Sequence, residues 1–113
     1  MERETVVETD EFVRLARAIM SDLDHAALVD LVASDPEVGV SLGSGLRKVR
    51  FARSGAGKSG GYRVIHFYRA DQGCPVFLLL VYAKNVLDNL SPTQLARLRL
   101  LGEVLGATYG RPP

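Results

Sequence analysis

Residues 46–69 read LRKVRFARSGAGKSGGYRVIHFYR, and two runs within this stretch alternate in side-chain character. In residues 46–53 apolar side chains alternate with lysine and arginine, and residues 62–69 divide in the same way into two alternating sets. Such alternation is typical of β-strands, whose successive side chains point to opposite faces of a sheet. The glycine-bearing link of residues 54–61 is short, which predicts that the two strands pair antiparallel.

The sequence on both sides of this stretch predicts the rest of the fold. The continuous apolar run of residues 76–83 favours a central strand covered on both faces. Residues 5–8 can form a short opening strand. Helical spacing of apolar residues predicts a helical hairpin over residues 10–34, with Thr9 or Asp10 as the cap of its first helix and a sequence like a capping box at Ser21 starting the second. Ser-Pro-Thr-Gln at residues 91–94 is a strong helix start. We expect an α+β fold, with the N-terminal helical hairpin packed on a twisted, mostly antiparallel sheet and followed by a C-terminal helix.

The composition indicates an ordinary globular protein. The chain has 113 residues, of which 47% are hydrophobic and 24% charged, so it can bury a core without disulfides. We expect one domain over residues 1–113, with residues 106–113 as a loose tail. No apolar run is long enough to span a bilayer, the N-terminus does not resemble a signal peptide, and the lone Cys74 fits a reducing compartment. These features predict a cytoplasmic protein with no membrane partner.

The charges are segregated along the chain. Residues 1–37 hold ten acids against three arginines, a balance of −7, whereas residues 38–84 hold eight bases against Asp71 alone, a balance of +7. An acid-poor basic stretch usually binds something polyanionic, and nucleic acid is the first partner to consider. The alternative is a solvated sheet face, although such a face normally mixes charges of both signs. The eight bases are Arg47, Lys48, Arg50, Arg53, Lys58, Arg63, Arg69 and Lys84.

Gly57-Lys58-Ser59 suggests a phosphate-binding P-loop, but its context does not fit one. That motif needs a glycine five residues before Gly57, where this chain has Ala52, and it needs a helix afterwards, where a strand is predicted. One interpretation is a flexible hairpin loop. We favour a mobile basic loop whose backbone N–H groups and Lys58 contact phosphates without binding a nucleotide.

Two further side chains each allow two interpretations. His66 could move a proton near neutral pH, although a histidine packed among strand side chains is commoner. Tyr82 could stack on a base, although a core tyrosine is the more frequent case. No pair of carboxylates lies in the basic half, so the sequence offers no ligands for two-metal chemistry, and we expect no metal and no cofactor.

The order of these motifs resembles that of a known family. Residues 46–69, followed by PVFLLLVYAKNVLDNLSPTQL at residues 75–95, resemble the RelE/HigB-like toxins of bacterial type II toxin–antitoxin systems. The similarity is greatest to the HigB branch, where a basic strand, a Gly-Lys-Ser-Gly-Gly loop, an Arg-bearing strand and a Tyr-Ala-Lys-Asn strand end follow one another. With SDPEVGVSLGSG at residues 34–45, the resemblance covers roughly residues 5–105.

The resemblance implies a ribosome-dependent endoribonuclease. Members of that family enter the ribosomal A site and cut mRNA without a metal, by attack of a ribose 2′-OH on the adjacent phosphate. Arginine and lysine stabilise the phosphorane that forms in this reaction. On this resemblance, the candidate catalytic residues are Lys58, Arg63 and Lys84. The candidate RNA-binding residues are Lys48, Arg50, Arg53 and Tyr82.

The same resemblance implies partners and leaves an alternative. The expected partners are the ribosome, mRNA and a cognate HigA-like helix-turn-helix antitoxin, with operator DNA contacted only through that antitoxin. The alternative is a non-catalytic or gyrase-directed, ParE-like toxin module of the same fold. A third possibility is that the basic face only packs against an acidic partner, which leaves the sequence of the glycine-rich segment unexplained.

Overall fold

A computed structural model describes residues 3–53, 57–84 and 90–110, and of residues 53 and 57–60 it describes the backbone only. The described residues form three α-helices, a short 3₁₀ helix and a five-stranded sheet, which confirms the predicted α+β class. In chain order the elements are β1 (Val6–Glu8), α1 (Asp10–Ile19), α2 (Asp22–Ser34), β2 (Val40–Gly43), β3 (Leu46–Arg53), β4 (Gly57–Phe67), η1 (Ala70–Gln72), β5 (Val76–Ala83) and α3 (Pro92–Tyr109).

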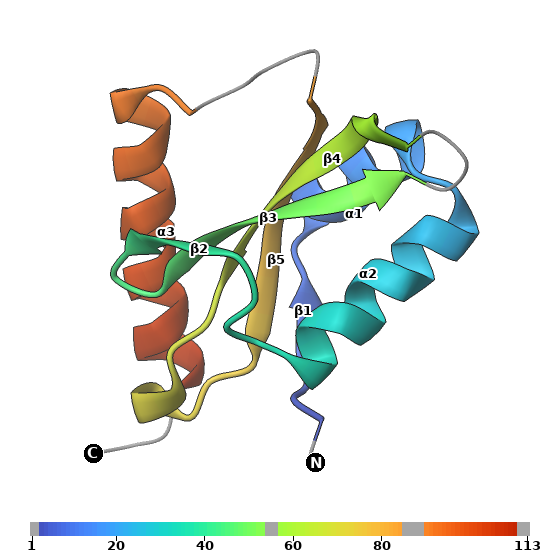
Figure 1. Cartoon of the computed structure of the whole chain (residues 1–113). Coiled ribbons are helices and arrows are strands. Elements are labelled where there is room, and N and C mark those ends of the chain that lie inside the picture. Colours follow the sequence, from blue (N-terminus) through green and yellow to red (C-terminus); the bar gives the residue numbers. More distant parts are fainter. Residues whose placement is uncertain (1–2, 54–56, 85–89, 111–113) are drawn as a thin grey trace.

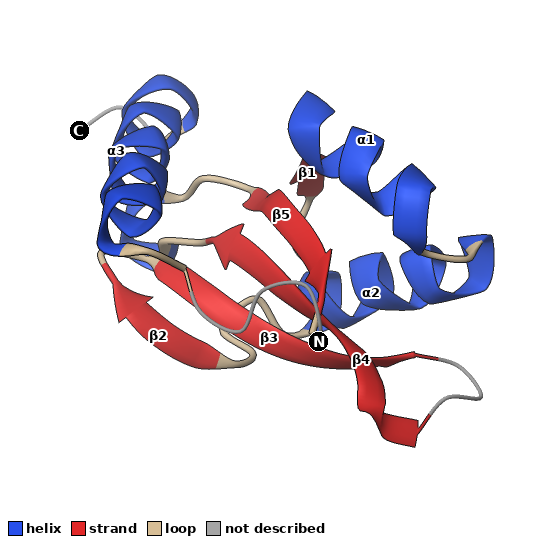
Figure 2. Cartoon of the chain, turned by 90° about the horizontal axis from the view of Figure 1, so that it is seen from above, coloured by secondary structure: helices blue, strands red, loops and turns tan. Residues whose placement is uncertain are grey.

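The sheet is mixed and lies between two layers of helices. Its strand order is β1-β5-β4-β3-β2, in which β1 pairs parallel to β5 and every other neighbouring pair is antiparallel. The predicted meander therefore corresponds to β3, β4 and β5. Figures 1 and 2 show α1 and α2 on one face of the sheet and α3 on the other.

Each face of the sheet has its own apolar core. The buried residues on the side of α1 and α2 are Phe12, Ala16, Met20, Leu28, Val32, Val49, Tyr62, Val64, Val76, Leu78 and Val81. Those on the side of α3 are Leu46, Ile65, Phe67, Cys74, Phe77, Leu79 and Leu98. Because β5 contributes to both cores, its continuous apolar run is explained by burial on two faces.

Side-chain caps place the helix starts where the sequence predicts them. The hydroxyl of Ser21 accepts a hydrogen bond from the N–H of Asp24 at 3.1 Å, and Thr9 caps α1 in the same way. At α3 the hydroxyl of Ser91 accepts from the N–H of Gln94, whose side chain accepts from the N–H of Ser91. This capping box satisfies two backbone donors at once. In the part of the chain that the structure describes, no helix is long and apolar enough to cross a membrane.

Two predicted loop segments are regular structure. Residues 57–61 belong to β4, where Gly57 pairs with Arg53, so the expected hairpin loop over this motif is wrong. The expected loose tail is also wrong for residues 106–109, because α3 continues through Tyr109. Gly106 is buried, and the ring of Tyr109 packs 5.6 Å from that of Phe77, so tertiary contacts hold this last turn in place.

Strand β2 was not predicted. Its four residues lie in a glycine-rich segment that shows no clear alternation, and the turn into β3 places Gly43, Ser44 and Gly45 at positive φ. The strand is held at the sheet edge by pairing with β3 and by Arg99 of α3, whose Nε donates to the carbonyl of Leu42 at 3.2 Å. Long-range contacts of this kind are not visible in a local sequence pattern.

Candidate nucleic-acid interface

A β-bulge in β5 determines which side chains of that strand face α3. The register between β4 and β5 shifts between Ile65 and His66, and Leu79 is skipped in the pairing. One extra residue reverses the side-chain alternation beyond it. Tyr82 consequently packs on the same core as Phe77, although their spacing of five residues would place them on opposite faces of a regular strand.

Two arginines lie directly opposite each other on this face of the sheet. Arg63 of β4 pairs in register with Arg50 of β3 on one side and with Tyr82 of β5 on the other. Side chains opposite each other in a sheet have Cβ atoms about 4.5–5.5 Å apart, and like charges in such a pair destabilise it. The row formed by Arg50, Arg63 and Tyr82 therefore concentrates positive charge at a cost to stability.

Arg63 is the most buried of these cations. Only 6% of its surface is exposed, and one guanidinium N–H donates to the carbonyl of Tyr62 at 3.4 Å. In residues 3–53, 57–84 and 90–110, no carboxylate forms a salt bridge with Arg50, Arg63 or Lys84. A buried cation is costly unless an anion compensates it, so an anionic ligand is the natural partner of this row.

Lys48 and Lys84 extend the cationic surface at both ends of the row. Lys48 lies two residues from Arg50 on the same strand and therefore on the same face. Lys84 follows β5 directly, and its backbone N–H donates to the carbonyl of Gly61 at 3.1 Å, which fixes this position to β4. Both lysines are half-buried. Three adjoining strands thus supply four cations. We call Lys48, Arg50, Arg63, Tyr82 and Lys84 the basic face.

Arg53 and Lys58 lie close to one another in the backbone pairing. Arg53 ends β3 opposite Gly57, and Lys58 is the next residue of β4. Their side chains lie outside the described part of the structure, so their roles stay predictions. Figure 1 shows that β5 ends and α3 begins at the same end of the molecule, which is the end toward which Tyr82 and Lys84 lie.

Two bases of the same stretch have structural contacts elsewhere. The guanidinium of Arg47 donates to the carbonyls of Val38 and Gly39, at 3.3 and 2.9 Å, and so holds the segment before β2. Arg69 forms a two-point ion pair with Asp71, with N–O distances of 3.1 and 2.8 Å. This hydrogen bonding lowers the pKa of the Asp71 carboxyl. Neither arginine belongs to the basic face.

His66 is a packed core residue, which confirms the commoner of its two interpretations. Its side chain is fully buried, and Nε2 donates to the carbonyl of Pro36 at 2.8 Å, after the end of α2. Desolvation by burial lowers the pKa of the imidazole, so the ring is held in its neutral form. By strand alternation His66 points to the side of α1 and α2, whereas Arg63 points to the side of α3.

Tyr82 fits the core interpretation, whereas stacking on a base stays a prediction. Its ring is half-buried and packs against the apolar core on the α3 side, as a core tyrosine does. It is also the register partner of Arg63, so the two side chains lie side by side on the basic face.

Fold and surface together define a class: a small α+β protein whose sheet presents clustered cations beside a C-terminal helix. A family model described as the RelE toxin of the RelE / RelB toxin-antitoxin system matches residues 4–110. The chain therefore belongs to the RelE toxin family, which confirms the resemblance seen in the sequence. It is a toxin of a toxin–antitoxin system, and toxins of this family pair with an antitoxin.

Proposed function

We propose that this toxin is a ribosome-dependent endoribonuclease that cuts mRNA in the ribosomal A site. The observation that carries the proposal is the pairing of the nearly buried Arg63 with Arg50, with no carboxylate among the described residues to neutralise them. Phosphate oxygens are the chemical group that such an arrangement fits best, because arginine donates to them in a planar, bidentate fork.

The proposed reaction needs no group beyond RNA and side chains. The ribose 2′-oxygen attacks the adjacent phosphorus and loses its proton, the bond from phosphorus to the 5′-oxygen breaks, and the leaving 5′-oxygen takes up one proton. The products are a 2′,3′-cyclic phosphate and a 5′-OH. Negative charge grows on the non-bridging oxygens as the phosphorane forms. Arg63, Arg50 and Lys84 would stabilise that charge more than the charge of the ground state, which is what accelerates a reaction.

The proton of the 2′-OH requires a base, and we assign this role to Lys58. A lysine among other cations can have its pKa lowered toward neutrality, whereas an arginine stays protonated. Lys58 belongs to the same strand as Arg63 and directly follows Gly57, the register partner of Arg53, so it lies on the hairpin that carries Arg50 and Arg63. Arg53, Lys48 and Tyr82 would then bind the flanking nucleotides.

The motif order supports a finer assignment within the family. We place the toxin in the HigB-like branch and expect a HigA-like helix-turn-helix antitoxin, with operator DNA bound only through that partner. A gyrase-directed activity of the ParE type is the competing outcome. The dense basic face favours the nuclease, because ParE-like proteins lack much of it.

A reconstituted translation reaction tests the proposal. Purified toxin should cleave an mRNA that is being translated and leave the same mRNA intact when ribosomes are omitted. Arg63→Gln should lower the cleavage rate by about a hundredfold or more, because it removes a preorganised charge from the transition state. Lys84→Ala should have a similar effect, because it removes a second cation of the basic face.

Arg17→Gln is the matched control, since Arg17 is an exposed arginine in the last turn of α1, on the opposite face of the sheet. Cleavage at the wild-type rate by both Arg63→Gln and Lys84→Ala would contradict the site assignment. Cleavage that does not depend on ribosomes would contradict the proposed function.

A further inference from the structure

The strand β4 contains a wide bulge beside the basic face. Phe51 of β3 pairs with Tyr62 of β4, and the next pair along the ladder is Arg53 with Gly57. Between these two pairs β3 has a single residue, whereas β4 has four, residues 58–61. A strand bends where it carries extra residues, and Figure 1 shows β4 bending near its start. The Gly-Lys-Ser-Gly-Gly motif therefore supplies this bulge.

Gly61, the last residue of the bulge, joins β4 to the end of β5. Its carbonyl accepts from the backbone N–H of Lys84 at 3.1 Å. The neighbouring register pair is Tyr62 with Ala83, so Gly61 and Lys84 lie opposite each other in the antiparallel ladder. Gly61 itself is buried. This contact sets the place of Lys84 relative to β4.

Gly61 has no room for a side chain. A Cβ at this position would lie 2.9 Å from the carbonyl oxygen of Phe51 and 3.7 Å from Cα of Ala52. Both are backbone atoms of β3, which cannot move aside as the end of a flexible side chain can. A glycine within a strand often marks such a close approach of two backbones. A methyl group here would therefore push the bulge away from β3.

The displacement would fall on the bulge and on Lys84, because the backbone on the other side of Gly61 is held firmly. Tyr62 is the next residue, and its hydroxyl donates to the carbonyl of Ile19 at 3.1 Å, which anchors β4 to the end of α1. Arg63 follows, and it is paired in register with both neighbouring strands. A shift at Gly61 thus changes the distance from Arg63 to the other cations.

We propose that Gly61 is a positioning residue, which sets the distances of Lys84 and of the segment that carries Lys58 from the guanidinium of Arg63. The proposal rests on the proposed nuclease, in which these three cations act on one phosphate. A displacement of about 1 Å at a reacting centre can lower a rate about a hundredfold. Gly61 acts only through its carbonyl and through the absence of a Cβ.

Single-turnover cleavage of an mRNA bound in the ribosome tests the proposal. Gly61→Ala should lower the rate constant at saturating toxin by about tenfold to a hundredfold, because the cations are present but displaced. The toxin concentration that gives half the maximal rate should change by less than about threefold, since every charge that contacts the ribosome is kept. A loss of folded protein alone would lower the amount of active toxin and leave the rate constant unchanged.

Gly102→Ala is the matched control. It makes the same chemical change at another buried glycine and overpacks against Phe67, four residues along β4 from Arg63. All rates are measured at a temperature at which circular dichroism shows each variant folded. We expect Gly102→Ala to cleave with the wild-type rate constant.

A backbone ester in place of the Lys84 amide isolates the hydrogen bond. The ester deletes the N–H that donates to Gly61 and adds no atom, so it avoids the overpacking that could unfold Gly61→Ala. We expect it to lower the rate constant at saturating toxin by about tenfold, with wild-type behaviour in the other respects.

Binding of inorganic pyrophosphate to the free toxin gives a readout that needs no ribosome. Arg63 and Lys84 should hold its two phosphates together, so Gly61→Ala and the ester should weaken binding by about fivefold or more. Gly102→Ala should bind with the wild-type affinity. Isothermal titration calorimetry measures these affinities.

Wild-type rate constants and wild-type pyrophosphate affinities in both Gly61→Ala and the ester would overturn the positioning role. If the wild type does not cleave mRNA, the proposed nuclease fails, and the pyrophosphate comparison alone decides for or against the positioning role. A wild type that neither cleaves mRNA nor binds pyrophosphate overturns both.

Discussion

The proposed function depends on Arg63 more than on any other residue. It is nearly buried, it lies opposite Arg50, and within the described part the only hydrogen bond of its guanidinium is a long one to the carbonyl of Tyr62. A position under selection for stability alone would favour an apolar side chain here, because a buried charge is penalised by desolvation and by its like-charged neighbour. On the proposed function, the cation is retained for binding despite this cost to stability.

Replacing this arginine should therefore stabilise the fold. We expect Arg63→Met, which keeps the length and loses the charge, to raise the free energy of unfolding by about 1 kcal/mol. Urea denaturation of the two proteins at low salt measures this difference. The same variant should be inactive as a nuclease. A loss of stability in Arg63→Met would show that the guanidinium has a structural partner.

His66 makes the stability of the protein depend on pH. Burial lowers its pKa in the folded state below the value near 6.5 of an unfolded chain. As the pH falls through about 6.5, the unfolded state binds a proton that the folded state does not, and the free energy of unfolding decreases.

We expect wild-type protein to lose more stability between pH 7.5 and 5.5 than His66→Gln, which cannot titrate. Urea denaturation at both values measures the two losses. Equal losses would mean that His66 is protonated to the same extent in both states.

The sequence suggests candidate residues for the site but not which of them are neighbours in the fold. Arg50, Arg63 and Lys84 stand out by charge and by their place in predicted strands. Their adjacency depends on the register between strands, and the position of Tyr82 depends on the bulge at Leu79. Register and bulges arise from packing between segments distant in the sequence, so no local pattern encodes them.

At the scale of elements, α3 is positioned by close approach to the sheet. Gly102 is buried against the ring of Phe67, and a Cβ at this position would lie 2.7 Å from Cδ2 of that ring. Gly106 approaches the end of the Gln72 side chain instead, which can move aside. The two glycines share a helix and differ in what they contact.

This difference predicts that replacing each glycine by alanine changes the free energy of unfolding by different amounts. Alanine gains up to about 1 kcal/mol over glycine within a helix. At Gly102 we expect overpacking against Phe67 to exceed that gain and to destabilise the protein by about 1–3 kcal/mol. Gly106→Ala should be close to neutral. Thermal or urea unfolding of both variants checks this, and equal effects would show that α3 is free to shift on the sheet.

Element boundaries were predictable wherever a side chain marks them. The caps at Thr9, Ser21 and Ser91 lie at the predicted helix starts, and β3 and β5 have the predicted limits. Prediction was wrong where tertiary contacts override local signals. The glycines of residues 57–61 continue a strand, and the end of α3 persists because Tyr109 packs on Phe77.

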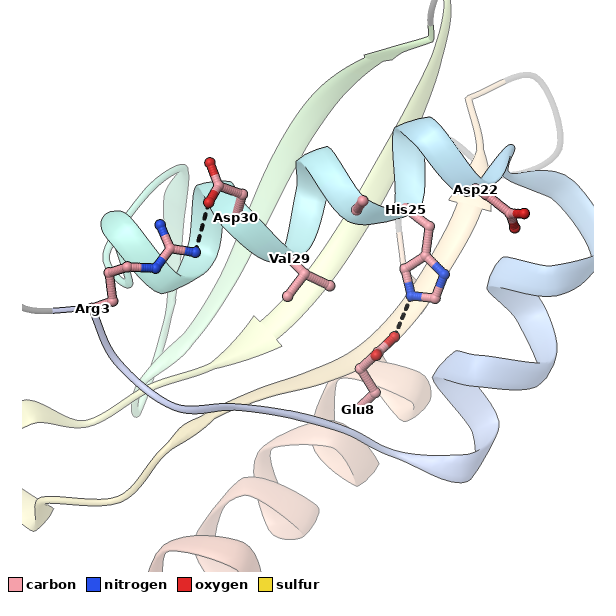
Figure 3. A pocket seen from close by; sticks show the side chains of 7 residues that line it. Arg3, Glu8, Asp22, His25, Val29 and Asp30 are labelled. Carbon is pink, nitrogen blue, oxygen red and sulfur yellow. Dashed lines mark hydrogen bonds and ion pairs between the residues drawn. The ribbon is translucent and has the colours of Figure 1, made fainter.

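At the scale of the whole molecule, the charge segregation of the sequence becomes a separation in space. The acidic first third forms β1, α1 and α2, and its Glu8, Asp22 and Asp30 line one pocket of the surface (Figure 3). The basic stretch forms β3 and β4, whose α3 side carries the basic face. One chain thus offers an acidic surface suited to a basic partner and a basic surface suited to RNA.

The central claim is that the basic face cuts mRNA on the ribosome, and mapping of mRNA 5′ ends tests it most directly. The toxin is induced in bacteria that lack the antitoxin, beside Arg63→Gln and the control Arg17→Gln. We expect new ends confined to translated regions, in phase with codons, present with the control and absent with Arg63→Gln. Growth arrest without such ends, as a gyrase-directed relative would cause, would contradict the account.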